Sequence, residues 1–224
     1  MKKQDLIFLA VIVIFFLPFF ISEEILNFYK NFNKEHGILM SFVKFSILAT
    51  LGEVIGLRIK EKVYFKKGFG IVPRAIVWGF LGITIKMAFI IFAKGVPEFL
   101  IQIGLENIND ENFLNKLIKA FSISASMNLI YAPIMMTLHK ITDTHILYNN
   151  GKIMCIFKKI KFGEILINLN WSVQWNFVFK KTIPFFWIPA HTITFLLPAE
   201  YQILFAAILG IILGILLAIA SLKK

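Results

Sequence analysis

The chain has 224 residues, of which 58% are hydrophobic, and its mean hydropathy is +0.77. This is more apolar than a soluble domain of the same length, which excludes an ordinary water-soluble globular protein. The net charge of +11 does not indicate nucleic-acid binding, because the basic residues are scattered between apolar runs and no recognition motif accompanies them.

Apolar runs with polar flanks predict six membrane-spanning helices, since about 20 apolar residues cross about 30 Å of hydrocarbon. In chain order these helices cover residues 5–22, 37–58, 71–93, 118–139, 182–197 and 201–222. The first follows a basic end but lacks a small-x-small cleavage site, so we interpret it as an uncleaved span. Prolines interrupt the fifth, and the sequence leaves open whether it crosses fully.

Two connecting segments have the spacing of interfacial structure. VPEFLIQIGLENINDENF, residues 96–113, predicts a short interfacial helix. IMCIFKKIKFGEILINLNW, residues 153–171, follows a turn signal and predicts an amphipathic helix or strand that carries lysines. The expected fold is therefore all-α, a polytopic membrane helix bundle in one domain over 1–224. Residues 1–36 form an added span and loop, and residues 37–224 form the core.

Basic residues are distributed unequally between the two sides of the predicted spans. Of 24 Lys and Arg residues, 17 fall on one side and 5 on the other, while Lys44 and Lys86 lie within spans. The positive-inside rule therefore predicts a multi-pass protein with both termini in the cytoplasm. If the fifth segment does not cross, Lys223 and Lys224 lie outside instead. Because Lys far outnumbers Arg, as is typical of AT-rich bacterial genomes, we expect the cell (cytoplasmic) membrane of a bacterium.

Small residues recur at helical spacing in three predicted spans. Because lipid tails are as apolar as leucine, helices in a bilayer associate through close backbone approach at such residues. We therefore expect close helix pairing there, the alternative being that glycine is merely common in membrane helices. The residues concerned are Gly52, Gly56, Gly79, Gly82, Ala206, Gly210, Gly214 and Ala218.

Ionisable side chains within the spans are candidate functional groups, because each costs about 2.5–3.5 kcal/mol to insert at membrane depth. Glu53 and Arg74 lie at similar heights in neighbouring spans, which predicts an ion pair that acts as a structural lock or as a gate. Lys86 and Asn128 lie at one level, with Tyr131 one turn below Asn128. They predict a water-filled path that prefers anions. Lys44 lies at comparable depth, where it either joins this path or extends its ammonium to the interface.

The segment WIPAHTITFLLP, residues 187–198, places a histidine between two prolines. Each proline frees a backbone carbonyl, so His191 is either a structural hydrogen-bonding group or a proton relay. This region resembles the C-terminal signature W-P-x-x-Q-x-x-N-F-x-x-V-P-x-x-x-R of the Mpv-seventeen/PMP-twenty-two family of small integral membrane proteins. The corresponding residues here are Trp187, His191, Thr194, Phe195, Pro198 and Gln202.

Further segments resemble the family in the same order from residue 37 to the C-terminus. Gly52 and Glu53 take the place of its G-D pair, and Arg74 that of an arginine. MNLIYAP, residues 127–133, takes the place of D-Q-x-x-x-x-P. The resemblance implies a helical core of four spans and a pore for small solutes in organelle membranes. Because Gln202 replaces the signature arginine, a charge-based gate is not implied at that position.

These features predict a channel-like or small-solute transport protein, or alternatively a structural or stress-related membrane protein that transports nothing. An enzyme is not expected, because no paired carboxylates, zinc-ligand spacing or nucleophile elbow is present. Neither catalytic residues nor a cofactor or metal are predicted. Expected partners are the lipid bilayer and a small solute or ion, with a homo-oligomer left open. The candidate pore residues are Glu53, Arg74, Lys86, Asn128, Tyr131 and His191.

Overall fold

A computed structural model of the chain describes residues 2–221, and the regular elements in this range are all helical. The chain forms two compact units, Met1–Met40 and Ser41–Lys224. Lys223 and Lys224, which entered the predicted orientation, lie outside the described residues.

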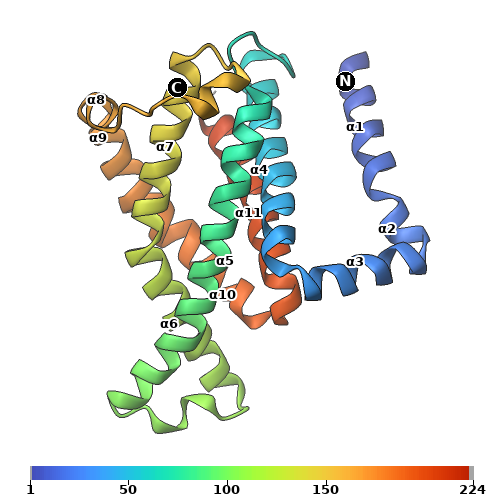
Figure 1. Cartoon of the computed structure of the whole chain (residues 1–224). Coiled ribbons are helices and arrows are strands. Elements are labelled where there is room, and N and C mark those ends of the chain that lie inside the picture. The colour runs from blue at the N-terminus through green and yellow to red at the C-terminus, as the bar shows by residue number, and fades with distance from the viewer. Residues whose placement is uncertain (1, 222–224) are drawn as a thin grey trace. The chain divides into compact units, whose positions relative to one another are not determined.

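The first unit begins with three consecutive helices, α1 (Lys3–Phe16), α2 (Pro18–Ile21) and α3 (Glu23–Glu35). Pro18 lacks the N–H that would continue α1 and begins the short α2 (Figure 1). The Ser22 hydroxyl then caps α3 by accepting a backbone hydrogen bond of 3.3 Å. With 14 residues, α1 is shorter than the usual transmembrane helix, so the first predicted span over 5–22 is not confirmed.

Within residues 2–221, three long helices are apolar enough to cross a membrane, and a bent pair makes a fourth if its two helices are one span. This supports membrane association, whereas the predicted six crossings are not confirmed. Many large apolar side chains on these helices are exposed, as lipid-facing side chains would be. The long helices are α4 (Gly37–Glu61), α5 (Ile71–Gln102) and α11 (Ala199–Ser221), and the pair is α6 (Phe113–Ile130) with α7 (Ala132–Tyr148).

The bend between α6 and α7 replaces the single helix predicted over 118–139. The two axes differ by 44°. Pro133 lies in the first turn of α7 and cannot donate to the carbonyl one turn back, which interrupts the hydrogen-bond ladder beside Tyr131. Residues on both sides of the bend, among them Asn128 and Met135, line a cavity within the second unit.

A continuous helical stretch joins α9 (Trp171–Val173), the π-helix η3 (Gln174–Trp187) and α10 (Ile188–Leu196). Its hydrogen bonds run from i+5 to i through η3, as in the bond from the Ile188 N–H to the Ile183 carbonyl. The predicted break at Pro189 is therefore wrong, because this proline lies in the first turn of α10. Only Pro198, which follows the extended Leu197, coincides with the end of a helix.

Shorter elements complete the second unit. They are η1 (Glu106–Asn109), η2 (Ile153–Phe157) and α8 (Phe162–Asn168). Because α5 continues through Pro97 to Gln102, residues 96–113 do not form the separate interfacial helix that was predicted. Residues 153–171 contain helical turns, and the strand alternative is not found in the described part of the chain.

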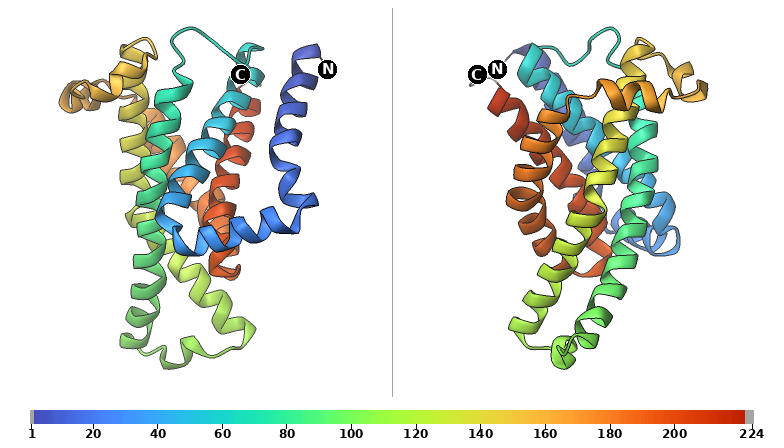
Figure 2. Two further views of the ribbon diagram at one scale, coloured as in Figure 1. Left: turned by 45° about the vertical axis from the view of Figure 1, so that its right-hand side comes forward. Right: turned by 90° about the vertical axis from the view of Figure 1, so that its left-hand side faces the viewer.

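Glycine faces bring α4 close to both α5 and α11 (Figure 2). A Cβ on Gly52 would lie 2.9 Å from the Ile211 Cα, and one on Gly214 would lie 3.2 Å from the Gly52 carbonyl oxygen. On α5, a Cβ on Gly82 would lie 2.6 Å from the Phe45 Cβ. The small-residue faces therefore mark close helix contacts, as predicted. Gly210 differs, because nothing lies within 4 Å of its added Cβ.

Candidate functional site

A buried arginine joins three helices of the second unit. Arg74 on α5 is 7% exposed, and its Nη1 lies 2.5 Å from Glu53 Oε2 on α4. The same guanidinium forms an ion pair with Asp143 on α7, and its Nε donates to the Phe69 carbonyl at 2.7 Å. The ion pair expected between Glu53 and Arg74 is thus present, and Asp143 is a second carboxylate that the sequence interpretation missed.

The other oxygen of Glu53 contacts two aromatic side chains. Trp78 Nε1 donates to Glu53 Oε1 at 2.7 Å, and His139 Nε2 lies 3.2 Å from the same oxygen. The rings of Trp78 and His139 pack with centroids 4.3 Å apart. Both carboxylate oxygens of Glu53 are therefore hydrogen-bonded, as a carboxylate away from water requires.

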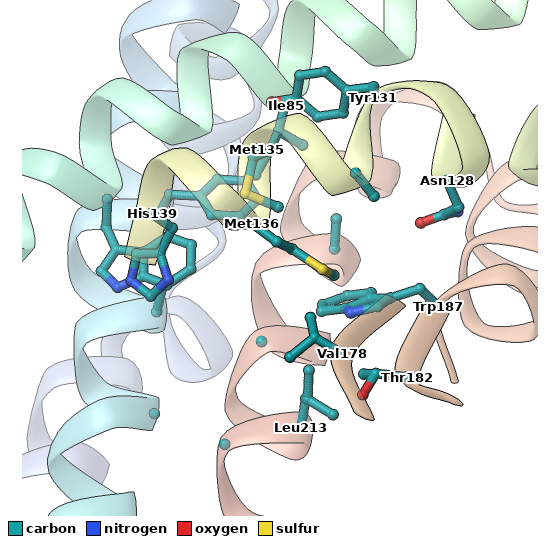
Figure 3. A pocket seen from close by; sticks show the side chains of 18 of the residues that line it. Ile85, Asn128, Tyr131, Met135, Met136, His139, Val178, Thr182, Trp187 and Leu213 are labelled. Carbon is teal, nitrogen blue, oxygen red and sulfur yellow. The ribbon is translucent and has the colours of Figure 1, made fainter. Parts of the chain in front are cut away.

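A cavity of about 320 Å³ lies beside this cluster (Figure 3). Its walls come from α4, α5, α6, α7, η3, α10 and α11, and all of them belong to the second unit. Most of the lining is apolar or small, which is usual for a site that binds an organic molecule. The larger apolar side chains are Phe45, Ile85, Met127, Met135, Met136, Val178 and Leu213.

Polar groups lie at several positions along this apolar wall. Asn128 Nδ2 donates to the Ser124 carbonyl at 2.8 Å and lies 3.1 Å from His191 Nδ1. The amide donates to His191 Nδ1, so the imidazole acts as an acceptor at that nitrogen. Figure 3 shows Asn128 and Trp187 on the same side of the cavity. The Tyr131 hydroxyl, also on the wall, lies 2.7 Å from that of Thr84.

The π-helix presents one face to the cavity. Gln174, Val178, Thr182 and Trp187 all line it, at intervals of four, four and five residues. With i→i+5 hydrogen bonding a turn takes between four and five residues, so these positions stay on one side of the helix. In an α-helix of about 3.6 residues per turn, Trp187 would lie nearly opposite Gln174. The wide helix thus determines which side chains reach the cavity.

Two donors on this face lack a hydrogen-bond partner. Gln174 Nε2 and Trp187 Nε1 are both buried and unpaired, and the Gln174 residue is only 7% exposed. A buried polar group without a partner costs free energy, and such groups are uncommon in folded proteins.

The predicted polar path is only partly assembled. Glu53, Asn128, Tyr131 and His191 line the cavity, whereas Arg74 and Lys86 do not. Ile85, the neighbour of Lys86, occupies the cavity-facing position, and Lys86 lies about 100° further round α5. The Lys44 side chain is buried within the protein, and the like charge of Lys86 lies near enough to repel its ammonium. The cavity therefore does not contain the pair of cations on which the predicted anion preference depended.

The residues that resemble the family signature have separate roles in the fold. Trp187 and His191 line the cavity, with ring centroids 5.1 Å apart. Thr194 is fully buried and bonds back to the Ala190 carbonyl, whereas Gln202 bonds to the Leu197 carbonyl beside Pro198. Phe195 packs against Phe89 of α5, with ring centroids 4.8 Å apart.

Among the described residues, no group of three or more His, Cys, Asp or Glu side chains is arranged to hold a metal ion. No family model, curated protein or solved structure matches the chain. The family resemblance therefore remains a prediction.

Proposed function

We propose that this chain is a channel-like or small-solute transport protein whose solute occupies the cavity beside the Glu53–Arg74 cluster. The observation that carries the proposal is a partly open space of about 320 Å³ whose wall includes all the helices suited to a membrane. Helices in a bilayer can pack against one another without leaving a space between them. A space of this size with polar groups on its wall is therefore better explained by a function than by packing. Because Glu53 and His139 line the cavity, a solute bound there would contact them and could alter the ion pair between Glu53 and Arg74.

The proposed setting is the cytoplasmic membrane of a bacterium, crossed six times with both termini inside. The distribution of basic residues supports this orientation. The unbroken helical stretch over residues 171–196 supports a further crossing near the fifth predicted position. Membership of the Mpv-seventeen/PMP-twenty-two family is likewise a proposal, supported by the order of the signature residues.

A structural role without transport is the second candidate, and the charged cluster favours it. Arg74 ties α5 to α4 and α7, and close glycine contacts join α4 to α11. These interactions would hold helices together whether or not a solute enters. In both proposals the protein is not an enzyme.

Solute flux into liposomes distinguishes the two candidates. Gly210 lines the cavity and has open space beside it, so Gly210→Leu fills the cavity without displacing a helix. The matched control is Gly95→Leu on α5, which also has open space but does not line the cavity. Light scattering after osmotic shock with glycerol or acetamide, and potassium chloride efflux, measure the rates.

For a transport protein, wild type accelerates at least one solute over empty liposomes, Gly210→Leu abolishes the acceleration and Gly95→Leu retains it. Equal rates for wild type and empty liposomes across the panel would reject transport in favour of the structural role. Acceleration that survives in Gly210→Leu would show a path elsewhere in the protein.

A further inference from the structure

Asn128 on α6 holds its side-chain amide in one orientation. Its Nδ2 donates to the Ser124 carbonyl at 2.8 Å and lies 3.1 Å from His191 Nδ1 on α10. A backbone carbonyl only accepts hydrogen bonds, so the end of the amide beside Ser124 must be the nitrogen and not the oxygen. The N–H groups are thus directed to Ser124 and His191, and the amide oxygen Oδ1 is turned away from them.

The Asn128 oxygen faces the cavity. The residue as a whole is only 1% exposed, and it lines the cavity. Figure 3 shows its oxygen turned toward the middle of the lining residues and its nitrogen turned away. Within residues 2–221, Oδ1 receives no hydrogen bond, and it is not among the unpartnered atoms that the protein covers completely. It is therefore an acceptor that a molecule in the cavity can reach.

The hydroxyl groups on the described part of the wall, those of Tyr131 and Thr182, donate their hydrogens elsewhere. Thr84 Oγ1 donates to the Leu81 carbonyl at 2.8 Å, so the hydrogen between Thr84 and Tyr131 belongs to Tyr131. The Thr182 hydroxyl donates to the Phe177 carbonyl at 3.1 Å. Neither hydroxyl is free to donate to the amide oxygen. Because a buried acceptor without a donor costs free energy, a molecule in the cavity that supplies the donor is favoured.

The charges on the wall favour a neutral occupant. The charged side chains on the described part of the wall are Glu53 and Lys140. Glu53 Oε2 lies 2.5 Å from Arg74 Nη1, and Lys140 Nζ lies 3.9 Å from Asp143 Oδ2. An ionised occupant would lose its water without gaining an unpaired counterion. Because most of the lining is apolar, the rest of the occupant should be hydrocarbon in character.

We propose that the cavity binds a neutral, mainly apolar molecule that carries one O–H or N–H donor, and that this donor bonds to Asn128 Oδ1. A volume of about 320 Å³ is about eleven times the share of one water molecule, roughly 30 Å³, so a molecule of about nine heavy atoms fits. This inference rests on the proposed function, because it takes the cavity as the solute site.

Binding of four linear probes of equal length tests the ligand class. Octan-1-ol carries a hydroxyl donor, 1-methoxyheptane carries an ether oxygen that only accepts, nonane carries neither, and octylammonium carries a charged donor. Affinities are measured by calorimetry on the purified full chain in detergent. They are expressed per free probe, after partition of each probe into empty micelles has been measured.

In wild type, octan-1-ol should bind about fivefold tighter than 1-methoxyheptane, the effect of one net hydrogen bond, because only the alcohol supplies a donor to Asn128. An apolar cavity without a reachable acceptor would give the reverse order, since the hydroxyl would lose its hydrogen bond to water and gain none. Octylammonium should bind more weakly than octan-1-ol.

Asn128→Leu removes the acceptor at similar side-chain volume. It should weaken octan-1-ol binding by about fivefold and should not weaken the binding of nonane. Retained nonane binding shows that the variant keeps its fold and its cavity. Gly210→Leu should abolish binding of every probe, because it fills the cavity, while Gly95→Leu should retain it.

Tighter binding of 1-methoxyheptane or octylammonium than of octan-1-ol by wild type would overturn the ligand class. Unchanged octan-1-ol binding in Asn128→Leu would overturn it as well. If Asn128→Leu does not fold, the order of the probes in wild type still decides. Solute flux that depends on Gly210 would then still support transport. Selective binding of octan-1-ol without any solute flux would instead support the ligand class and reject transport.

Discussion

Arg74 is the residue whose loss has the largest expected effect on stability. Its buried guanidinium forms ion pairs with both Glu53 and Asp143, which are themselves 19% and 15% exposed. Arg74→Met would leave both carboxylates charged and poorly solvated, so we expect the free energy of unfolding to fall by about 3–5 kcal/mol. The measurement is unfolding of the purified protein by titration with sodium dodecyl sulfate in mild-detergent micelles.

Variants of the same cluster separate its two ion pairs. When combined with Arg74→Met, Glu53→Gln and Asp143→Asn should each recover part of the lost stability, because each removes one buried charge that has lost its partner. Lys66→Met serves as the control, since Lys66 pairs with Glu61 on the surface and should change stability by about 1 kcal/mol or less. Simple additivity between Arg74→Met and both carboxylate variants would show that the cluster is not coupled.

Cys155 on η2 should be a poorly reactive thiol. Its side chain is buried, and burial raises the pKa of the Cys155 thiol above the ordinary value. A raised pKa leaves less thiolate at neutral pH, and the thiolate is the species that reacts with maleimides. Labelling at pH 7 followed by mass spectrometry should be about tenfold or more slower in the folded protein than after denaturation. Equal rates would mean that η2 does not cover the thiol.

At the scale of elements, the contact between α4 and α11 depends on glycine. A methyl group at Gly52 would lie 2.9 Å from the backbone of Ile211, so Gly52→Ala must push the helices apart. We expect it to lower the unfolding free energy by about 1–3 kcal/mol. Gly95→Ala meets nothing within 4 Å and should be neutral or stabilising by up to about 1 kcal/mol. An equal response of the two variants in the same titration would contradict close packing at Gly52.

The sequence identified those elements whose signal is a long apolar run. The helices expected over 37–58, 71–93 and 201–222 correspond to α4, α5 and the described part of α11. The π-helix η3 was missed because its composition resembles that of any amphipathic segment, and i→i+5 bonding leaves no clear mark in the sequence. The spacing of four between Gln174, Val178 and Thr182, followed by five to Trp187, was its one visible sign.

The sequence predicted the part of the site in which two residues lie at the same depth in neighbouring helices. It predicted less well which side chains line the cavity, because tertiary packing determines that. Glu53 and Arg74 could be paired from their positions in adjacent spans. His139 and Asp143 were overlooked because the predicted fourth span ended at residue 139, although their spacing of four puts both on one helix face. Lys86 was assigned to the path from its helical phase, but Ile85 and Lys86 follow Gly82 by three and four residues, so both lie near that face and packing decides that Ile85 lines the cavity.

For the whole molecule, the number of membrane crossings is a testable prediction. Among the described helices, length and composition suffice for three crossings, or four with the bent pair, whereas the distribution of basic residues favours six. The two counts differ because only the count of six includes a crossing by the first helices and a crossing by residues 171–196. If that second stretch crosses, the exposed Glu200 lies on the side opposite to Phe65.

Labelling of single cysteines in intact cells decides the topology. In a Cys155→Ser background, six crossings predict that an impermeable maleimide labels Glu106→Cys and Glu200→Cys directly. Phe65→Cys, in a loop expected inside, should react only after the membrane is permeabilised. If Glu200→Cys is also protected until permeabilisation, residues 171–196 enter and leave on the same side. The cavity would then be walled by a re-entrant π-helix, which a bilayer tolerates only where protein or water satisfies its backbone.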